Sequence, residues 1–281
     1  MKNNHQAQSM RVPFFQVDAF SRHPFSGNPA AVCMLEKWLD DTTLQRIAQE
    51  NNLSETAFVV KTGDSYGLRW FTPAVEVDLC GHATLAAACV LFTRYVPHAE
   101  EIRFHTRSGE LTVRGSDEGY ILNFPLVHPV RIDTPPGLLA ALGLGSGPAE
   151  IWQASDIVVI INDENVLDSL SPDFSALAQF DTRGVVVCTP AKAFDFRSRW
   201  FGPQVGVNED PVTGSAHTFL APLWGEKLGK KVLSAQQGGK RKGEITCRIK
   251  ENNRVELCGE ACIVIEGELF VSLPHGDNAS R

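Results

Sequence analysis

The sequence lacks the motifs of several large protein classes. It has no C-x-x-C pair, no P-loop and no G-x-G-x-x-G, so nothing in it requires a zinc cluster or a nucleotide. Its longest apolar stretch, residues 83–92, is too short to cross a bilayer, and the first ten residues lack the apolar core of a signal peptide. We therefore expect a cytoplasmic protein without metal or cofactor, whose seven cysteines are free thiols.

Basic charge is scarce as well. The chain has 26 Lys and Arg against 33 Asp and Glu, a net charge of −7, whereas nucleic acids and anionic membranes bind basic surfaces. One pocket can still be basic inside an acidic protein. The charge balance therefore favours a small molecule, and neither a nucleic acid nor a membrane, as the ligand.

The composition is that of a globular protein, with 43% hydrophobic and 21% charged residues. At roughly 150 residues per domain, 281 residues indicate about two domains. Residues 1–10 are expected to form a flexible tail, with order beginning near Val12. The first expected elements are strands over 14–19, 30–35 and 55–61, and a helix that Asp40 or Asp41 caps and that ends near Asn51.

An internal repeat is the most informative feature. Residues 69–77 (RWFTPAVEV) recur as residues 199–207 (RWFGPQVGV), with six of nine positions identical at an offset of 130. Two copies at this distance indicate two homologous domains rather than a solenoid. Prolines and glycines over residues 125–148 mark the link between them. We expect domains over 11–128 and 129–281, and the final strand can return to the first domain.

Each copy is followed by a glycine and an Ala-rich helical stretch, Cys80-Gly-His-Ala-Thr84 in the first and Thr213-Gly-Ser-Ala-His217 in the second. A helix start leaves backbone N–H groups free, and glycine lets a ligand approach them. If a pseudo-twofold axis relates the copies, Gly81 and Gly214 both face one cleft. We expect an anion such as a carboxylate or sulfate at one or both helix starts.

Three polar residues, two of them close in sequence to these glycines, have both a structural and a functional interpretation. His82 can brace a turn, or it can bind a ligand and handle protons. Asp210 can cap a helix, or it can place a carboxylate between the domains. Glu55 can be a surface residue at a strand start. It can also enter an apolar pocket, where burial raises its pKa above about 4.3 and makes it an acid and base.

Cys80 raises the question of a two-thiol mechanism, in which one cysteine from each half removes and returns a proton on opposite faces of a substrate. Aligning Gly81 with Gly214 places Cys80 opposite Thr213, so the second thiol is absent. The repeat therefore disfavours two-face epimerisation and favours a packing role for Cys80.

Together these residues resemble the PhzF family of phenazine-biosynthesis-like isomerases, from about Val12 to Phe270, most closely its vertebrate-type members. Phe20 to Val32 is similar to the family's opening motif, and Asn52-Leu-Ser-Glu-Thr-Ala-Phe58 to its N-L-S-E-T-A-F signature. The segments around Gly81 and Gly214 are similar to its two helix starts. The family often shows an R-G-G-E-L run preceded by a serine, and over Gly239–Ile245, at the expected wall of the pocket, the serine and one glycine are replaced.

The resemblance implies an α+β, diaminopimelate epimerase-like fold of two pseudo-symmetric domains, each with a curved sheet around a central helix. It implies a homodimeric, cofactor-independent isomerase that moves a proton on one face of a small, anionic biosynthetic metabolite. Glu55 is then the catalytic acid and base. The implied substrate-binding residues are Gly81, His82, Asp210, Thr213, Gly214 and Ser215, with Asn28 and Cys80 as further candidates.

Two other functions stay open. An amino-acid or imino-acid racemase or epimerase would depend on Cys80, so that Cys80→Ser would abolish its activity. A non-catalytic binding protein that retains the fold would tolerate the loss of Glu55.

Overall fold

The computed structural model describes residues 9–145 and 149–272. The predicted tail over residues 1–10 lies largely outside the described residues. Its last two positions differ from the prediction, because the first strand begins at Ser9 rather than near Val12. Strand pairing explains the difference, since Ser9 lies opposite Ser272 and Met10 opposite Val271 of the last strand.

The strands are β1 (Ser9–Ala19), β2 (Asn28–Leu35), β3 (Glu55–Thr62), β4 (Ser65–Phe71), β5 (Glu76–Val77), β6 (Glu101–Thr106), β7 (Gly109–Ser116), β8 (Gly119–Pro125), β9 (Val130–Arg131), β10 (Glu150–Gln153), β11 (Ile157–Ile160), β12 (Val185–Pro190), β13 (Phe196–Gly202), β14 (Val207–Asp210), β15 (Val232–Gln237), β16 (Gly243–Lys250), β17 (Arg254–Gly259) and β18 (Ala261–Ser272). The helices are α1 (Asp41–Asn51), α2 (Gly81–Val90), η1 (Leu91–Tyr95), α3 (Leu138–Ala141), α4 (Glu164–Ser169), α5 (Phe174–Leu177), η2 (Pro203–Val205) and α6 (Gly214–Leu228).

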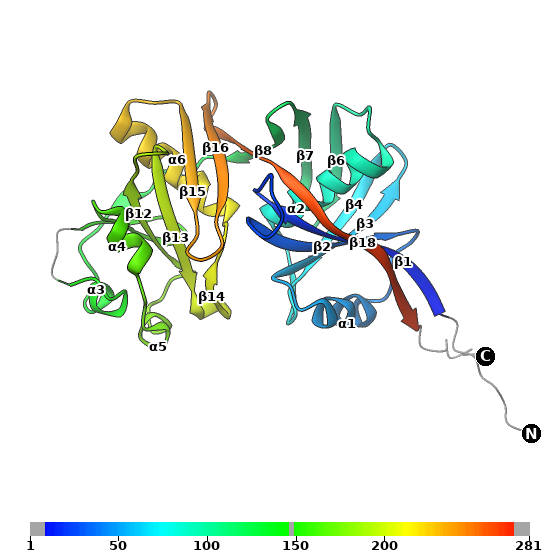
Figure 1. The fold of residues 1–281 in the computed structure, drawn as a ribbon, viewed down its shortest axis with the longest axis horizontal. Coiled ribbons are helices and arrows are strands. Elements are labelled where there is room, and N and C mark those ends of the chain that lie inside the picture. The colour runs from blue at the N-terminus through cyan, green and yellow to red at the C-terminus, as the bar shows by residue number, and fades with distance from the viewer. Residues whose placement is uncertain (1–8, 146–148, 273–281) are drawn as a thin grey trace, which may run out of the picture.

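Two lobes lie side by side, and each has one helix enclosed by strands (Figure 1). In the first lobe, α2 is buried from His82 to Val90 and packs against β1, β2, β3, β8 and β18. In the second lobe, α6 is buried over most of its length and packs against β15, β16 and β17. Helices that are apolar on all sides belong inside a protein, so these two form the centres of their lobes.

Further helices pack on the outer faces of the sheets in both lobes. On the first lobe, α1 begins after Asp40, whose side chain accepts a hydrogen bond from the backbone N–H of Thr43. Its buried residues Leu44, Ile47 and Ala48 pack on the apolar side chains of β2 and β3. On the second lobe, α3, α4 and α5 cover β10 to β13. The predicted first strands and the cap of α1 are therefore confirmed.

The repeated segments occupy equivalent places in the two lobes. Arg69 on β4 forms a two-pronged ion pair with Glu76 (Nε to Oε1 and Nη2 to Oε2, both 2.7 Å). Arg199 on β13 forms the same pair with Glu209, at 2.8 Å for both contacts. Each guanidinium also lies 5.1 Å from the ring two residues on, Phe71 or Phe201. The two copies therefore share side-chain contacts as well as sequence, as homologous units would.

The two lobes are joined through their sheets. The antiparallel pair β8 and β17 connects them, and β18 leaves the second lobe to pair with β1 along its whole length (Figure 1). We propose that the domain boundary lies near residue 129, because β8 ends at Pro125 and β9 already pairs with β10 of the second lobe.

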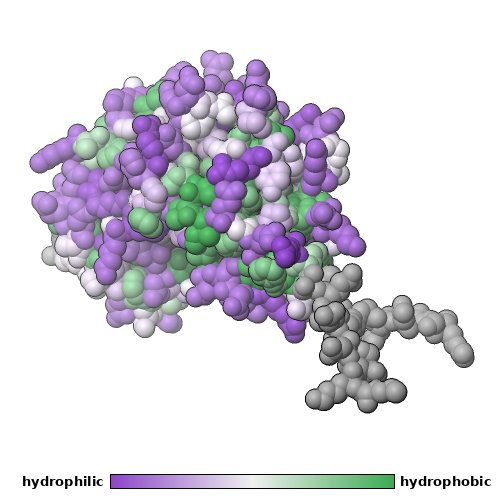
Figure 2. Space-filling view, turned by 45° about the vertical axis from the view of Figure 1, so that its right-hand side comes forward, coloured by the Kyte–Doolittle hydropathy of each residue, from purple (hydrophilic) through white to green (hydrophobic). Residues whose placement is uncertain are grey.

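The surface agrees with the charged composition. One face is largely hydrophilic, with apolar residues gathered near its middle (Figure 2). Within the described residues, no helix combines the length and the apolar character needed to span a membrane.

Candidate active site

The N-termini of α2 and α6 meet between the lobes. A Cβ atom added to Gly81 would lie 3.8 Å from Cα of Gly214, and one added to Gly214 would lie 3.9 Å from Cα of Gly81. Neither helix start has a side-chain cap, so their first backbone N–H groups are free to bind a ligand. The two glycines face each other, and because neither has a side chain, the helix starts can approach closely. The predicted anion at this place stays a prediction.

Glu55 is the first residue of β3 and lies beside His82 of α2. Its Oε2 is 3.1 Å from Nε2 of His82, although the two groups are not aligned for a hydrogen bond. The glutamate side chain is 18% exposed and the histidine side chain 7%. The Ser54 hydroxyl, one residue earlier, lies 3.2 Å from the same Nε2. A carboxylate and an imidazole therefore share a mostly enclosed place that solvent still reaches.

The predicted rise in the pKa of Glu55 is wrong. Burial does raise the pKa of this carboxyl, but the charge of His82 and the contacts with His82 and Ser54 outweigh it, and the net shift is downward. Burial lowers the pKa of His82, yet Cys80 and Glu55 together raise it well above 6.5. The pair is therefore a carboxylate beside an imidazolium at neutral pH, so Glu55 is ready to accept a proton.

Cys80 stands on the other side of the same imidazole, with its Sγ 3.5 Å from Nδ1 of His82. Burial, followed by the nearby Glu55 charge, raises the pKa of this buried thiol. A raised pKa disfavours the thiolate, and thiols are nucleophiles and bases only as thiolates.

Asp210 reaches the site from the second lobe. Its Oδ1 accepts a hydrogen bond from Nδ2 of Asn28 (2.8 Å), and its Oδ2 accepts one from Oγ1 of Thr213 (2.5 Å). Asn28 also accepts a bond from Ser54 (3.3 Å), so a chain of polar contacts connects Asp210 to the Glu55–His82 pair. Asp210 is not a helix cap, since the N-cap position of α6 is Thr213.

Asp210, not Glu55, is the carboxyl with the raised pKa. Burial raises the pKa of Asp210 to about 6, against the opposing effects of His82 and of the hydrogen bonds from Thr213 and Asn28. The site thus holds two carboxyls with pKa values shifted in opposite directions, an arrangement typical of acid–base catalysis.

Arg183 and Asp156 belong to this region, and sequence reasoning missed both. Nη1 of Arg183 donates to Oγ of Ser215 at 3.0 Å, next to Gly214. The same guanidinium donates through Nε and Nη2 to the carboxylate of Asp156 at 2.8 and 2.6 Å. The second lobe therefore contributes a cation to the site, where the first contributes a glutamate and a histidine.

His217 is structural. Its side chain is fully buried, Nδ1 donates to the carbonyl of Thr213 at 2.9 Å, and Nε2 has no partner among the described residues. Thr84 makes the same contact in α2, where its hydroxyl donates to the carbonyl of Cys80 at 2.5 Å. Burial lowers the pKa of His217 to about 4, so the imidazole is neutral in the folded protein.

We expect His217 to make the fold sensitive to acid. Its pKa is about 4 when folded and about 6.5 when unfolded, so the unfolded chain binds more protons between these values. Stability that is present above pH 6.5 is lost as the pH falls towards 4, by about 3 kcal/mol. His217→Thr copies the residue of the first repeat and removes the titrating ring. Urea unfolding at each pH measures how much less stable this variant is than the unaltered protein. That difference in unfolding free energy should shrink by about 3 kcal/mol as the pH falls from 6.5 to 4.

The raised pKa of Asp210 makes the free energy of unfolding fall as the pH rises from 3.8 to 6, the opposite of the His217 effect. Both His217→Thr and the unaltered protein contain Asp210, so its contribution cancels when the two are compared. A deficit that is the same at pH 4 and pH 6.5 would show that His217 does not titrate as stated.

Glu55, Cys80 and His82 also bring three potential ligand atoms within 4.8 Å of one another. Both ring nitrogens of His82 already face protein groups, and a histidine with a raised pKa offers no lone pair to a metal. The donor set therefore fits a charged hydrogen-bonding cluster better than a metal centre.

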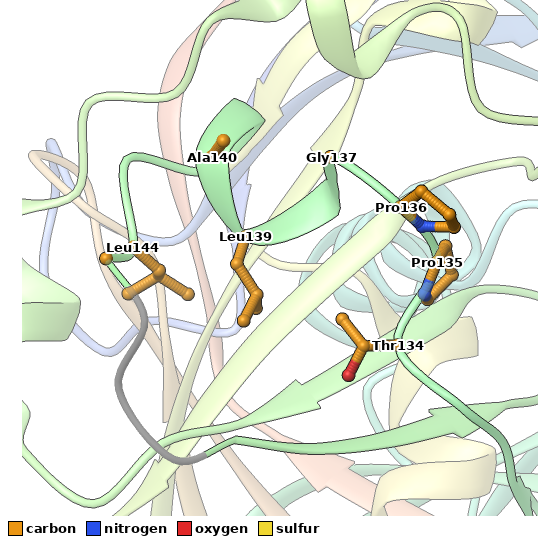
Figure 3. A pocket seen from close by; sticks show the side chains of 8 residues that line it. Thr134, Pro135, Pro136, Gly137, Leu139, Ala140 and Leu144 are labelled. Carbon is orange, nitrogen blue, oxygen red and sulfur yellow. The ribbon is translucent and has the colours of Figure 1, made fainter.

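A pocket of about 420 Å³ lies in the second lobe, away from this cluster (Figure 3). It is lined by Thr134, Pro135, Pro136, Gly137, Leu139, Ala140, Leu144 and Gly145. None of these side chains is ionisable, so the lining supplies no acid or base.

The two-lobed fold, with its helix starts meeting beside a glutamate–histidine pair, defines an isomerase of the epimerase-like class. The chain belongs to the PhzC-PhzF family, described as phenazine biosynthesis-like protein, which matches residues 17–267. A protein of Pseudomonas aeruginosa named as an uncharacterized isomerase is 54% identical, over 93% of this chain and 100% of its own. The human phenazine biosynthesis-like domain-containing protein is 41% identical, over 92% and 99%.

Solved structures agree with this assignment. The crystal structure of a PhzF family protein from Enterococcus faecalis superposes with a TM-score of 0.90 at 48% identity, covering 93% of this chain and 100% of that one. A hydroxyproline epimerase from Agrobacterium vitis, at 10% identity and a TM-score of 0.56, shares the fold alone. The predicted epimerase-like fold is therefore confirmed.

Proposed function

We propose that this isomerase moves a proton within a small anionic metabolite and uses Glu55 as its single acid and base. The observation that carries the proposal is the Glu55–His82 pair, with Oε2 and Nε2 3.1 Å apart. The charge of His82 keeps Glu55 ionised, and the glutamate side chain is still 18% exposed, so the carboxylate can accept a proton from a substrate.

Among the described residues, the positions of the second lobe that correspond to Glu55 and Cys80 hold no base. Strand pairing places Phe58 opposite Arg69 and Val187 opposite Arg199, so Glu55 corresponds to Gly184 in the other lobe. Cys80 corresponds to Thr213, the N-cap residue of the other helix. One base on one side supports removal and return of the proton on the same face of the substrate. Inversion would need a second base opposite.

In the reaction, Glu55 takes a proton from a carbon next to an electron-withdrawing group, and the electron pair of that C–H bond moves into the substrate. The protonated Glu55 then returns the proton to another carbon of the same molecule, which restores the carboxylate. The free N–H groups at the starts of α2 and α6 can stabilise the charge that develops in between. Independence of cofactors and a cytoplasmic location, expected from the sequence, and a homodimer, implied by the family resemblance, stay predictions.

Deuterium exchange tests this proposal. The protein is incubated in D₂O with a panel of small unsaturated carboxylates, and mass spectrometry measures incorporation at carbon. Exchange that requires Glu55 supports the proposal. Exchange that proceeds equally well in Glu55→Gln would contradict it.

The alternative, a racemase or epimerase that uses Cys80, has one observation in its favour, the contact of 3.5 Å between Sγ and Nδ1 of His82. Because burial raises the pKa of Cys80 and disfavours the thiolate, we expect Cys80→Ser to change the exchange rate by less than about tenfold, well below the 10²–10⁴-fold effect of a general acid–base group. A loss as large as that of Glu55→Gln would instead support the thiol mechanism.

A further inference from the structure

Both oxygens of the Asp210 carboxylate accept hydrogen bonds from side chains whose own orientation is fixed. Nδ2 of Asn28 donates to Oδ1 at 2.8 Å, and Oγ1 of Thr213 donates to Oδ2 at 2.5 Å. Asn28 begins β2 in the first lobe and is fully buried. Its Nδ2 also donates to the carbonyl of Val212 at 3.0 Å. A carbonyl can only accept, so the amide nitrogen of Asn28, and not its oxygen, must face Asp210.

Gln237, the last residue of β15, orients the hydroxyl of Thr213. Its Oε1 accepts a hydrogen bond from the backbone N–H of Thr213 at 2.9 Å, and its Nε2 donates to the backbone carbonyl of Asp210 at 3.0 Å. Each backbone group can act in one way only, so the two together settle which end of the amide is the nitrogen. That nitrogen also donates to Oγ1 of Thr213 at 3.0 Å. The single hydroxyl hydrogen of Thr213 is therefore left for Asp210.

The end of β15 is shaped for this contact. Gln237 is 1% exposed, and the next residue, Gly238, has a φ of +121°. A Cβ atom on Gly238 would lie 2.9 Å from the carbonyl oxygen of Pro211 and 2.0 Å from that of Arg241. A residue with a side chain does not fit between these carbonyls, so the glycine lets the strand end approach the turn over residues 210–213.

The corresponding positions of the opposite lobes, both within the described residues, hold no amide. Strand pairing matches Gln237 with Thr106, whose hydroxyl donates to the carbonyl of Gly109 in its own turn at 2.8 Å. It matches Asn28 with Ala154, whose methyl group cannot donate. The fold that the lobes share does not need these two amides, which favours a role for them in the site.

The charged groups near Asp210 are His82 and Glu55 of the first lobe and Arg183 of the second. Burial raises the pKa of Asp210, and the two hydrogen bonds oppose this rise, because donors to a carboxylate stabilise its ionised form. The attraction between Asp210 and His82 also exceeds the repulsion from Glu55. This attraction is reciprocal, so an ionised Asp210 supports the charge of His82.

We propose that Asn28 and Gln237 are positioning residues that keep Asp210 a carboxylate at neutral pH by aiming two donors at its oxygens. Asn28 acts directly and from the other lobe, whereas Gln237 acts through the hydroxyl of Thr213. The inference goes beyond the proposed function, in which Glu55 alone moves the proton. It assigns the charge state of the second carboxyl in the site and names the side chains that set it.

Carboxyl-carbon NMR of the full-length protein tests this proposal, since it measures the pKa of Asp210 without a substrate. At pH 6 about half of Asp210 is ionised in the unaltered protein. Thr213→Val and Asn28→Leu each remove one donor and add no charge, so in each variant the pKa should rise and the ionised fraction at pH 6 should fall. Gln236→Met is the matched control and should change neither, because this residue points to the opposite face of β15.

Gln237→Met should raise the pKa of Asp210 only while Thr213 keeps its hydroxyl, so in the Thr213→Val background it should have no further effect. A change that merely loosened the turn would act equally in both backgrounds. Because Gln237→Met leaves two backbone groups without partners and can unfold the protein, Gln237→Glu provides a second variant. It keeps an acceptor for the Thr213 N–H and presents an oxygen in place of Nε2, so the hydroxyl can turn away from Asp210. Its effect should therefore be larger with Thr213 than in the Thr213→Val background.

A pKa of Asp210 that stays at about 6 in both Thr213→Val and Asn28→Leu would overturn the proposal. So would an effect of the Gln237 variants that is the same in both backgrounds. The two proposals fail separately, because the NMR titration involves no substrate. Proton exchange that proceeds without Glu55 would remove only the proton assignment. Glu55-dependent exchange in a protein whose Asp210 does not respond to these donors would remove only the positioning roles.

Discussion

Glu55→Gln is expected to lower the rate of substrate proton exchange by at least about two orders of magnitude, because general acid–base groups contribute about 10²–10⁴-fold. Glutamine retains the shape of the side chain but cannot take the proton. Affinity for the substrate should change little, since a neutral amide still fills the place of the carboxylate. Single-turnover rates and dissociation constants separate the two effects.

The matched control is Glu50→Gln, an exposed glutamate of α1, which should leave the exchange rate unchanged. The Glu55→Gln variant should also show a spectroscopic change. With the Glu55 charge removed, the pKa of His82 should fall from its raised value, and NMR of the imidazole reports this directly. Near-normal exchange by a folded Glu55→Gln protein would disprove the role of Glu55.

His82→Gln is expected to move the acidic limb of the pH–rate profile to higher pH. The His82 charge is the strongest influence that lowers the pKa of Glu55, so its removal lets burial dominate, and the pKa of Glu55 rises. Glu55 must be ionised to accept a proton. At a pH below both the old and the new pKa of Glu55, a rise of one in this pKa should therefore slow the reaction by about tenfold.

The profile of kcat/KM from pH 4 to pH 8 measures this displacement. The pKa of Asp210 should rise in the same variant, because His82 also lowers it. His105→Gln is the matched control, since His105 lies 3.9 Å from Glu110 in an exposed pair outside the site. An acidic limb at the same pH in His82→Gln and in the unaltered protein would show that His82 does not tune Glu55.

Much of the fold could be predicted because its signals are local or repeated. The cap of α1 and the first strands follow from short patterns, and the repeat of residues 69–77 predicts two similar lobes. The helix starts at Gly81 and Gly214 follow the repeat directly. The register of β1 against β18 could not be predicted, because no local pattern shows which distant strand a segment joins.

The candidate site was only partly predictable for the same reason. Glu55 and His82 are 27 positions apart, and only the packing of α2 on β3 reveals that an imidazolium lies beside the carboxylate. Burial alone predicts a raised pKa for Glu55, and the unseen neighbour reverses the sign. Arg183 lies outside the repeated segment, and no sequence pattern indicates its contact with Ser215, which is 32 positions away.

The pairing of β18 with β1 has a consequence for the order of folding during synthesis. β1 lies between β2 and β18, so one edge of this strand stays open until the ribosome has made residues 261–272. The strands and helices of the first lobe are complete more than 130 residues earlier, near Pro125. The nascent chain must therefore carry an apolar strand edge, which includes Val12 and Phe14, through the synthesis of the whole second lobe. Chaperones that shield such edges would act on this protein throughout the synthesis of its second lobe.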